Sequence, residues 1–185
     1  MKRNTVTVIA EANGSGKTTF AKYYMELKPQ AFLNADEIAF EIAGKDYASV
    51  QLKAGKEYFR RLKKLRLSGK DFMFESTLSG KTVGNLLKEM KLDGYEIQII
   101  YLLLETPDVC VARVKERVKA GGHHVPEADI IRRYNRSRTN FWGKYRLLAD
   151  SWHMYYNSDD RFDEVASGSG ENFQVNSPDL LEVFM

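Results

Sequence analysis

The stretch AEANGSGKTTF, residues 10–20, carries most of the G-x-x-x-x-G-K-[ST] pattern of a phosphate-binding loop. It follows the β-branched, apolar run TVTVIA (5–10), which is typical of a buried central strand, and it leads into a helical pattern. The glycines allow successive backbone N–H groups to turn inward toward an anion, and the positive end of the next helix adds to this attraction. The sequence therefore predicts a nucleotide phosphate site near the start of the chain.

Within this loop, Lys17 is expected to reach the β- and γ-phosphates and to take part in catalysis. The hydroxyl of Thr18 is expected to bind Mg²⁺. The predicted nucleotide-binding residues are Asn13, Gly14, Ser15, Gly16, Lys17, Thr18 and Thr19.

Glu11 is the one departure from the pattern, because counting back from Gly16 puts it where the first glycine belongs. A residue with a Cβ fits there if its backbone dihedrals are ordinary. A carboxylate close to a triphosphate, however, repels the ligand. One interpretation is a tolerated side chain that points outward into solvent or pairs with a cation, and the other is weakened ATP binding. We favour the outward side chain.

Length and composition indicate one folded domain over residues 1–185, because 43% of the residues are hydrophobic. The mild net charge of +3 suits a small acidic substrate better than a nucleic-acid track. Cys110 lies in the apolar run VCVA, which favours a buried structural thiol. No signal peptide and no run of about 20 apolar residues is visible, so we expect a cytoplasmic protein without a membrane span.

Strand-like runs alternate with helical ones along most of the chain. This alternation predicts an α/β fold with a mainly parallel sheet covered by helices on both faces. Ligands bind beyond the carboxyl ends of such strands, so the loops after the early strands should gather at one edge. A C-terminal hairpin and helix are expected over about 159–185. The predicted strands are 5–10, 31–36, 71–76, 95–105 and 151–157.

Two acidic residues follow predicted strands. Asp36, in FLNADEIA, can accept a proton from a substrate hydroxyl, and it can also cap the next helix. Glu75 ends DFMFE and can support Mg²⁺ or bind substrate hydroxyls, the alternative being a surface charge at a strand end.

Two basic helices joined by GGHHVP predict a hinged lid over about 113–138. Arginines on a lid can close over phosphates and exclude water, although a solvated helix face is the alternative for about half of them. His123 and His124 lack a metal-ligand set and are interpreted as lid residues. The candidate arginines are Arg113, Arg117, Arg132, Arg133, Arg136 and Arg138.

Taken together, five segments resemble the zeta-toxin-like P-loop kinases, in the same order, from about residue 5 to 158. The resemblance implies a P-loop kinase fold with a five-stranded parallel sheet, flanking helices and a lid. It also implies ATP and Mg²⁺ as cofactors, phosphorylation of a hydroxyl of UDP-N-acetylglucosamine, and a possible antitoxin partner. The segments are NGSGKTTFA (13–21), FLNADEIA (32–39), FESTLSGK (74–81), GGHHVPEADIIRRYNRS (121–137) and LADSWHMYYNS (148–158).

By this resemblance Asp36 matches the catalytic base, and Arg117 and Arg133 match arginines that clamp phosphate. The predicted substrate-binding residues are Asn34, Glu75, Thr77 and Arg136. The chain lacks the long extra segments of the well-known toxins, which leaves another metabolite or nucleoside kinase as an alternative. A nucleotide-binding relative that Glu11 has inactivated is a second alternative, and nucleic-acid processing is the least favoured.

Overall fold

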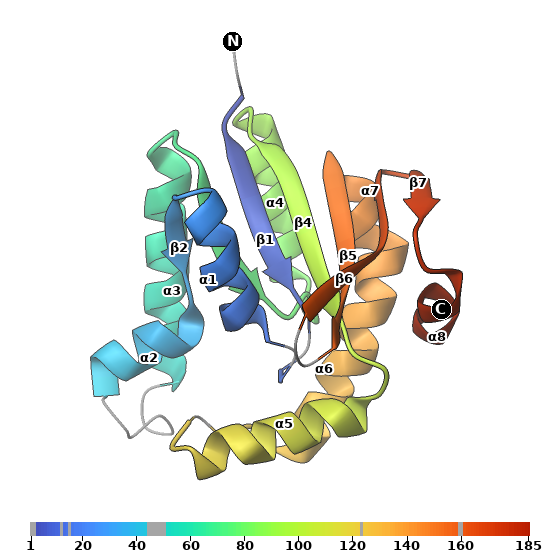
Figure 1. Ribbon diagram of the computed structural model, residues 1–185. Coiled ribbons are helices and arrows are strands. Elements are labelled where there is room, and N and C mark those ends of the chain that lie inside the picture. The colour runs from blue at the N-terminus through green and yellow to red at the C-terminus, as the bar shows by residue number, and fades with distance from the viewer. Residues whose placement is uncertain (1–2, 12, 15, 44–50, 123, 159–160) are drawn as a thin grey trace.

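The computed structural model of the chain describes residues 3–11, 13–14, 16–43, 51–122, 124–158 and 161–185. In these residues a single sheet of seven strands has the order β2-β3-β1-β4-β5-β6-β7 (Figure 1). The first five in that order are parallel to one another. Strand β6 is antiparallel to β5, and β7 is antiparallel to β6. The strands are β1 (Thr5–Ala10), β2 (Ala31–Leu33), β3 (Phe72–Ser76), β4 (Glu96–Leu103), β5 (Ser151–Ser158), β6 (Arg161–Ser169) and β7 (Asn172–Val175).

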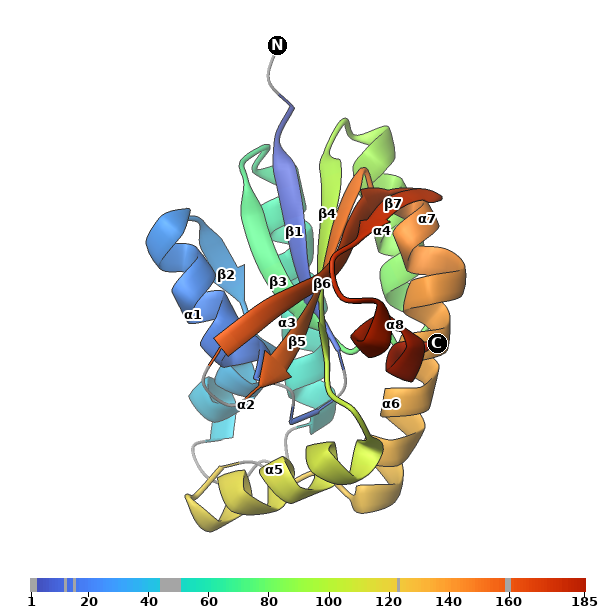
Figure 2. The ribbon, with the colours of Figure 1, turned by 45° about the vertical axis from the view of Figure 1, so that its right-hand side comes forward.

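The expected count of five strands is therefore wrong, although the five parallel strands are those predicted. The C-terminal hairpin does not stand apart from the sheet but joins it. Without β6, strand β5 would expose a row of unpaired backbone groups at the sheet edge. Strand β6 pairs with β5 from Ser158↔Arg161 to Trp152↔Gly168 and satisfies that edge. In Figure 2, β6 lies in front of β5, its partner at this edge of the sheet.

Helices cover the two faces of this sheet unequally. In Figure 1, α1 lies on the near face, and α3, α4 and α6 lie behind the strands. A π-helical turn, Phe141–Tyr145, continues α6 into α7. The helices are α1 (Lys17–Leu27), α2 (Ala35–Ala43), α3 (Gln51–Leu67), α4 (Thr82–Leu92), α5 (Pro107–Lys119), α6 (Glu127–Asn140), α7 (Arg146–Leu148) and α8 (Pro178–Phe184).

The period of two in the strands divides the core into two apolar clusters. On one face Val8 of β1 shares a cluster with Leu62 of α3 and Leu87 of α4. On the other face Ile9, the next residue, shares a cluster with Phe20 of α1. Strand β1 is buried on both sides, as the apolar run at 5–10 predicted.

A third apolar cluster joins α5 to α6 at the carboxyl ends of the strands. It contains Cys110 and Val114 of α5 with Ile130 and Tyr134 of α6, and Leu104 connects it to the end of β4. Cys110 is fully buried, as predicted. The α5–α6 pair therefore has its own core, next to the edge where the strands end (Figure 1). In the described part of the chain, no helix is long and apolar enough to cross a membrane.

Phe141 should be essential for stability, because it is fully buried and stacks on Tyr101 with ring centroids 4.3 Å apart. We expect Phe141→Ala to lower the free energy of unfolding by about 3–5 kcal/mol, since the cavity adds to the lost burial. Urea unfolding measures this. Leu92→Ala is the control, because Leu92 is 88% exposed and should change stability by less than about 0.5 kcal/mol.

Candidate active site

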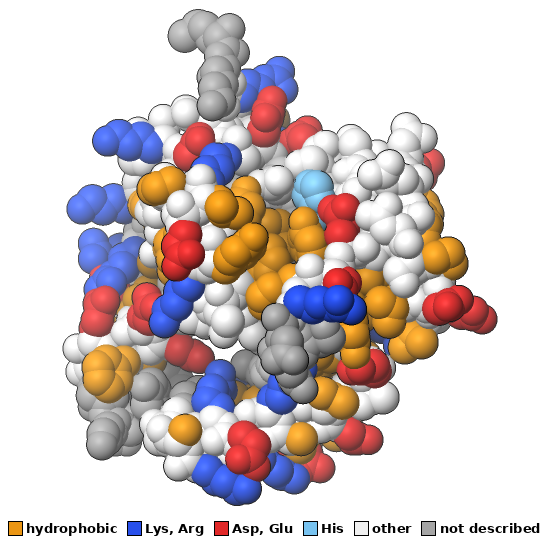
Figure 3. All heavy atoms as spheres, viewed as in Figure 1, with side chains coloured by type: hydrophobic (Ala, Val, Ile, Leu, Met, Phe, Trp, Pro, Cys, Tyr) orange, Lys and Arg blue, Asp and Glu red, His pale blue; other side chains and the backbone are white. Residues whose placement is uncertain are grey.

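The loops after β1, β2 and β3 converge on a pocket of about 660 Å³ that also faces α5 and α6. Figure 3 shows a hollow between the end of the sheet and α5, with basic side chains along the side that α5 forms. The pocket is lined by Asn13, Gly14, Gly16, Lys17, Thr18, Thr19, Asn34, Ala35, Asp36, Gly55, Tyr58, Phe59, Glu75, Ser76, Thr77, Ser79, Val83, Arg113, Arg117, Arg132 and Arg133.

The phosphate loop has the backbone that its glycines predict. Gly14 and Gly16 have φ angles of 98° and 91°, a region that side chains with a Cβ rarely adopt. Lys17 opens α1, and its ammonium group donates to the backbone oxygen of Glu11 at 3.2 Å. Asn13, Gly14, Gly16, Lys17, Thr18 and Thr19 all line the pocket, and Ser15 lies outside the described residues.

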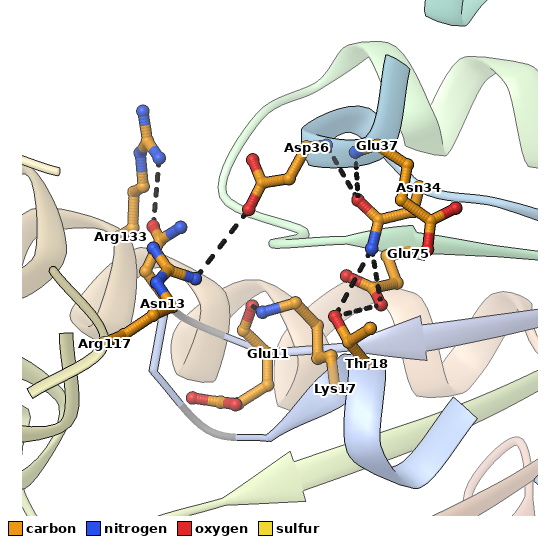
Figure 4. A network of polar contacts seen from close by, with 10 residues as sticks. All are labelled: Glu11, Asn13, Lys17, Thr18, Asn34, Asp36, Glu37, Glu75, Arg117 and Arg133. Atoms are coloured by element: carbon orange, nitrogen blue, oxygen red, sulfur yellow. Dashed lines mark hydrogen bonds and ion pairs between the residues drawn. The ribbon is translucent and has the colours of Figure 1, made fainter. Parts of the chain in front are cut away.

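Glu11 does not point outward, so that expectation is wrong. The residue is only 1% exposed, and its Oε1 accepts a hydrogen bond from Cys110 Sγ at 3.9 Å. Its φ of 155° lies at the extended limit of the region that favours glycine. Figure 4 shows the carboxylate pointing away from Asp36 and Glu75, and Glu11 does not line the pocket. The carboxylate is therefore buried on the side of Cys110 and is not part of the pocket lining.

Thr18 of α1, Glu75 of β3 and Asn34 at the start of α2 form a compact polar network (Figure 4). Thr18 Oγ1 donates to Glu75 Oε1 at 2.9 Å. Asn34 Nδ2 donates to the same carboxylate oxygen at 3.2 Å and to Thr18 Oγ1 at 3.3 Å. The network joins the predicted metal residue to two predicted substrate-binding residues.

Asn34 also begins α2. Its Oδ1 accepts from the backbone N–H of Asp36 at 2.7 Å and of Glu37 at 3.3 Å. This is the hydrogen bonding of a helix N-cap, so the capping role considered for Asp36 belongs to Asn34. Asp36 lies in the first turn, where its carboxylate reaches the pocket.

Burial raises the pKa of Glu75, with the opposing effects of the nearby Lys17 ammonium and the Thr18 hydrogen bond only partly offsetting it. The Thr18 hydroxyl and the Glu75 carboxylate present the hard oxygen atoms that Mg²⁺ prefers. These two side chains would hold the metal, with Asn34 orienting the carboxylate. No cluster of three or more His, Cys, Asp or Glu that could hold a metal occurs in the described residues.

Two arginines of the α5–α6 pair reach across to the loops. Arg117 pairs with Asp36 at 3.7 Å, and Arg133 donates to Asn13 Oδ1 at 2.9 Å (Figure 4). The side chains of Arg117 and Asp36 are both more than a third exposed, so this ion pair contributes about 1 kcal/mol or less. The contact between Arg117 and Asp36 is therefore weak enough to be exchanged for a contact with phosphate.

The remaining candidate side chains divide between the pocket and the surface. Arg113, Arg132 and Thr77 line the pocket, whereas Arg136 is exposed and is not among the lining residues. Arg138 lies over the Phe184 ring, 5.7 Å from its centroid. His124 lines a separate cavity between α5 and α6, and His123 is outside the described residues.

Helix α3 forms one side of the pocket, which the sequence pattern did not indicate. Tyr58 is buried and donates to the backbone oxygen of Glu75 at 2.7 Å, and Phe59 lines the pocket while 43% exposed. The signal was an adjacent aromatic pair after Gly55 on a helix otherwise rich in Lys and Arg. Its amphipathic pattern showed that the helix packs on the sheet, but not which turn faces a ligand.

Comparison with protein families finds a match over residues 1–162 to the family described as Zeta toxin. Among curated proteins no match is found.

Several solved structures share the fold. A chain of the AvrRxo1-ORF1:-ORF2 complex with ATP is 16% identical, with a TM-score of 0.76, over 97% of this chain. The present chain spans only 63% of that relative's length. A chain of the PezAT chromosomal toxin–antitoxin system of Streptococcus pneumoniae is 19% identical, with a TM-score of 0.74, over 100% of this chain and 80% of that one.

Shikimate kinase from Acinetobacter baumannii, in complex with shikimate, is more distant. It is 17% identical, with a TM-score of 0.51, over 85% of each chain. At these identities the similarities establish the fold, which is that of the P-loop kinases.

Replacement of Glu75 by Gln should stabilise the protein at neutral pH. Because burial raises the pKa of Glu75 above its ordinary value of 4.5, the folded chain holds this proton more tightly than the unfolded chain. The stability contributed by the protonated form is complete below the unfolded pKa and is lost as pH rises through the folded pKa. We therefore expect Glu75→Gln to have the higher thermal midpoint at pH 7.

Thermal unfolding between pH 4 and 8 checks this expectation. The difference between Glu75→Gln and the parent should shrink as the pH falls toward the ordinary value of 4.5. A difference of constant size over the whole range would contradict the assignment of the effect to ionisation of Glu75.

Proposed function

The chain belongs to the zeta toxin family, and we propose that it is an ATP-dependent phosphotransferase that acts on a hydroxyl of a small molecule. The observation that carries the proposal is the convergence of a phosphate loop, a strand-end carboxylate and arginines on one pocket. Fold and family membership both support a nucleotide-dependent kinase.

The phosphate loop is the proposed ATP site. Backbone N–H groups around Gly14 and Gly16, with the start of α1, suit a triphosphate, and Lys17 would reach its β- and γ-phosphates. The similar AvrRxo1 complex was solved with ATP, which supports the same ligand here. Mg²⁺, held by Thr18 and Glu75, would supply positive charge to the phosphate oxygens.

Asp36 is the proposed general base. It would accept the proton of the acceptor hydroxyl as that oxygen bonds to the γ-phosphorus of ATP. The bond from the γ-phosphorus to the bridging β–γ oxygen breaks, and ADP leaves. Arg117 already lies 3.7 Å from Asp36. Together with Arg133 and Lys17 it would stabilise the charge on the transferring phosphoryl group.

The acceptor is proposed from resemblance. UDP-N-acetylglucosamine is the first candidate, because family resemblance implies it, and the pocket volume lies in the range of small-molecule sites. Shikimate kinase and a gluconokinase share the fold, which supports a test of other metabolite hydroxyls. Similarity to a toxin–antitoxin system supports an antitoxin as a protein partner.

Asp36→Asn should abolish transfer and leave ATP binding intact. Loss of a general base lowers turnover by about 10²–10⁴-fold. Release of ADP in the presence of an acceptor measures turnover, and calorimetry with Mg·ATP measures binding. Glu37→Gln is the matched control, because Glu37 is the neighbouring carboxylate on the same turn but does not line the pocket.

The two measurements separate the alternatives. Normal turnover by Asp36→Asn would refute the assignment of the base. A parent protein that binds Mg·ATP but transfers phosphate to none of the acceptors would favour a non-catalytic nucleotide-binding module. Without Mg·ATP binding by the parent, the kinase proposal itself would fail.

A further inference from the structure

We propose that Glu11 is a positioning residue that fastens the phosphate loop to α5. This attachment would hold the arginines of α5 at a fixed position relative to the loop. The fastening is a property of the ligand-free protein. Its consequence for ATP affinity rests on the proposed function.

The first contact is between side chains. Glu11 is 1% exposed and Cys110 is fully buried, and Cys110 Sγ donates to Glu11 Oε1 at 3.9 Å. A thiol is a weak donor, and the acceptor here is a carboxylate oxygen. Burial and the nearby Glu11 carboxylate raise the pKa of the Cys110 thiol, which keeps the donor proton in place.

The second contact is between backbones, and it involves the same residue of α5. A Cβ on Gly14 would lie 2.6 Å from the backbone oxygen of Cys110, closer than such atoms approach. The phosphate loop therefore lies directly against α5 at Gly14. Two positions of the loop, Glu11 and Gly14, therefore contact the same residue of α5, Cys110.

The backbone of Glu11 also forms hydrogen bonds with residues of the candidate active site. Its N–H donates to Ser76 O at 3.2 Å, at the end of β3. Its carbonyl oxygen accepts from Lys17 Nζ at 3.2 Å. One residue thus contacts the neighbouring strand, the catalytic lysine and α5.

On α5 the contact point and the arginines share one side of the helix. Arg113 and Arg117 lie three and seven residues after Cys110, a spacing that places them on the same face. Both line the pocket, and Arg117 pairs with Asp36. Cys110 and Arg117 are about 10 Å apart along a rigid helix, so the position of Cys110 sets that of Arg117.

A carboxylate in this position is costly, because burying a charge is unfavourable unless its contacts offset the cost. Glycine would avoid that cost and would suit a φ of 155°. What glycine would lack is the side chain that reaches Cys110. The proposal therefore assigns Glu11 a role that the usual glycine of the pattern does not have.

Hydrogen exchange in the nucleotide-free protein tests the fastening. We expect Glu11→Ala and Glu11→Gly to speed exchange about tenfold in the phosphate loop and also in α5, because local opening becomes easier in both. Cys110→Ala should speed exchange in the same two segments. Unchanged exchange in β4 would establish that each variant is folded.

Two further variants sharpen the test. Glu11→Gln keeps the shape and one acceptor oxygen, and it should restore most of the protection. Glu116→Ala removes a carboxylate from the exposed side of α5, where it pairs with Lys119, and should leave the loop unchanged. Faster exchange in the loop alone after Glu11→Ala, or parent-like exchange in Glu11→Gly, would overturn the proposal.

Kinetics tests the consequence for the proposed reaction. Glu11→Ala should raise the KM for Mg·ATP about tenfold and leave the KM for the acceptor unchanged, with Glu11→Gln close to the parent. If Glu11→Ala speeds hydrogen exchange in both the phosphate loop and α5, but the protein binds no Mg·ATP, the role of Glu11 is supported and the kinase proposal is refuted. If the protein is a fully active kinase, but Glu11→Ala does not speed hydrogen exchange in both segments, only the proposed role of Glu11 is refuted.

Discussion

The parallel pairing of β1 with β3 sets the register on which the site depends. Ile9 lies opposite Glu75, and Ala10 lies opposite Ser76, so the phosphate loop leaves β1 beside the end of β3. The pairing Leu33↔Phe74 then brings Asn34 to the same carboxylate. A slip of one residue in either pair would turn the strand's side chains to the opposite face and separate Thr18 from Glu75.

Most of the site could be predicted, because its residues lie at or just after the carboxyl ends of strands. The alternation of strands and helices placed Lys17, Asp36 and Glu75 at one edge, and the structure brings them into one pocket. The burial of Glu11 could not be predicted, because its partner Cys110 is 99 residues away in sequence. The sheet extension by β6 was missed for a similar reason, since the hairpin pattern alone does not say which edge it pairs with.

Charge in the pocket suits an anionic ligand. Of the described residues that line it, five are cationic and only two, Asp36 and Glu75, are carboxylates. Burial raises the pKa of Glu75, which means that the ionised form destabilises the ligand-free fold. A metal ion or a nearby cation would favour that ionised form. Cation binding, the ionisation of Glu75 and the stability of the fold are therefore coupled.

Glu75 and Glu11 show that the direction of a carboxylate matters more than its distance from the loop. Glu75 faces the pocket, where its charge can hold a cation next to Thr18. Glu11 stands within the phosphate-loop pattern itself, yet its carboxylate points to the buried side, toward Cys110. Glu11 is buried and does not line the pocket, so its carboxylate is not among the groups that would meet a bound triphosphate. In the role proposed for Glu11, the residue that replaces the glycine attaches the loop to α5 through its contact with Cys110.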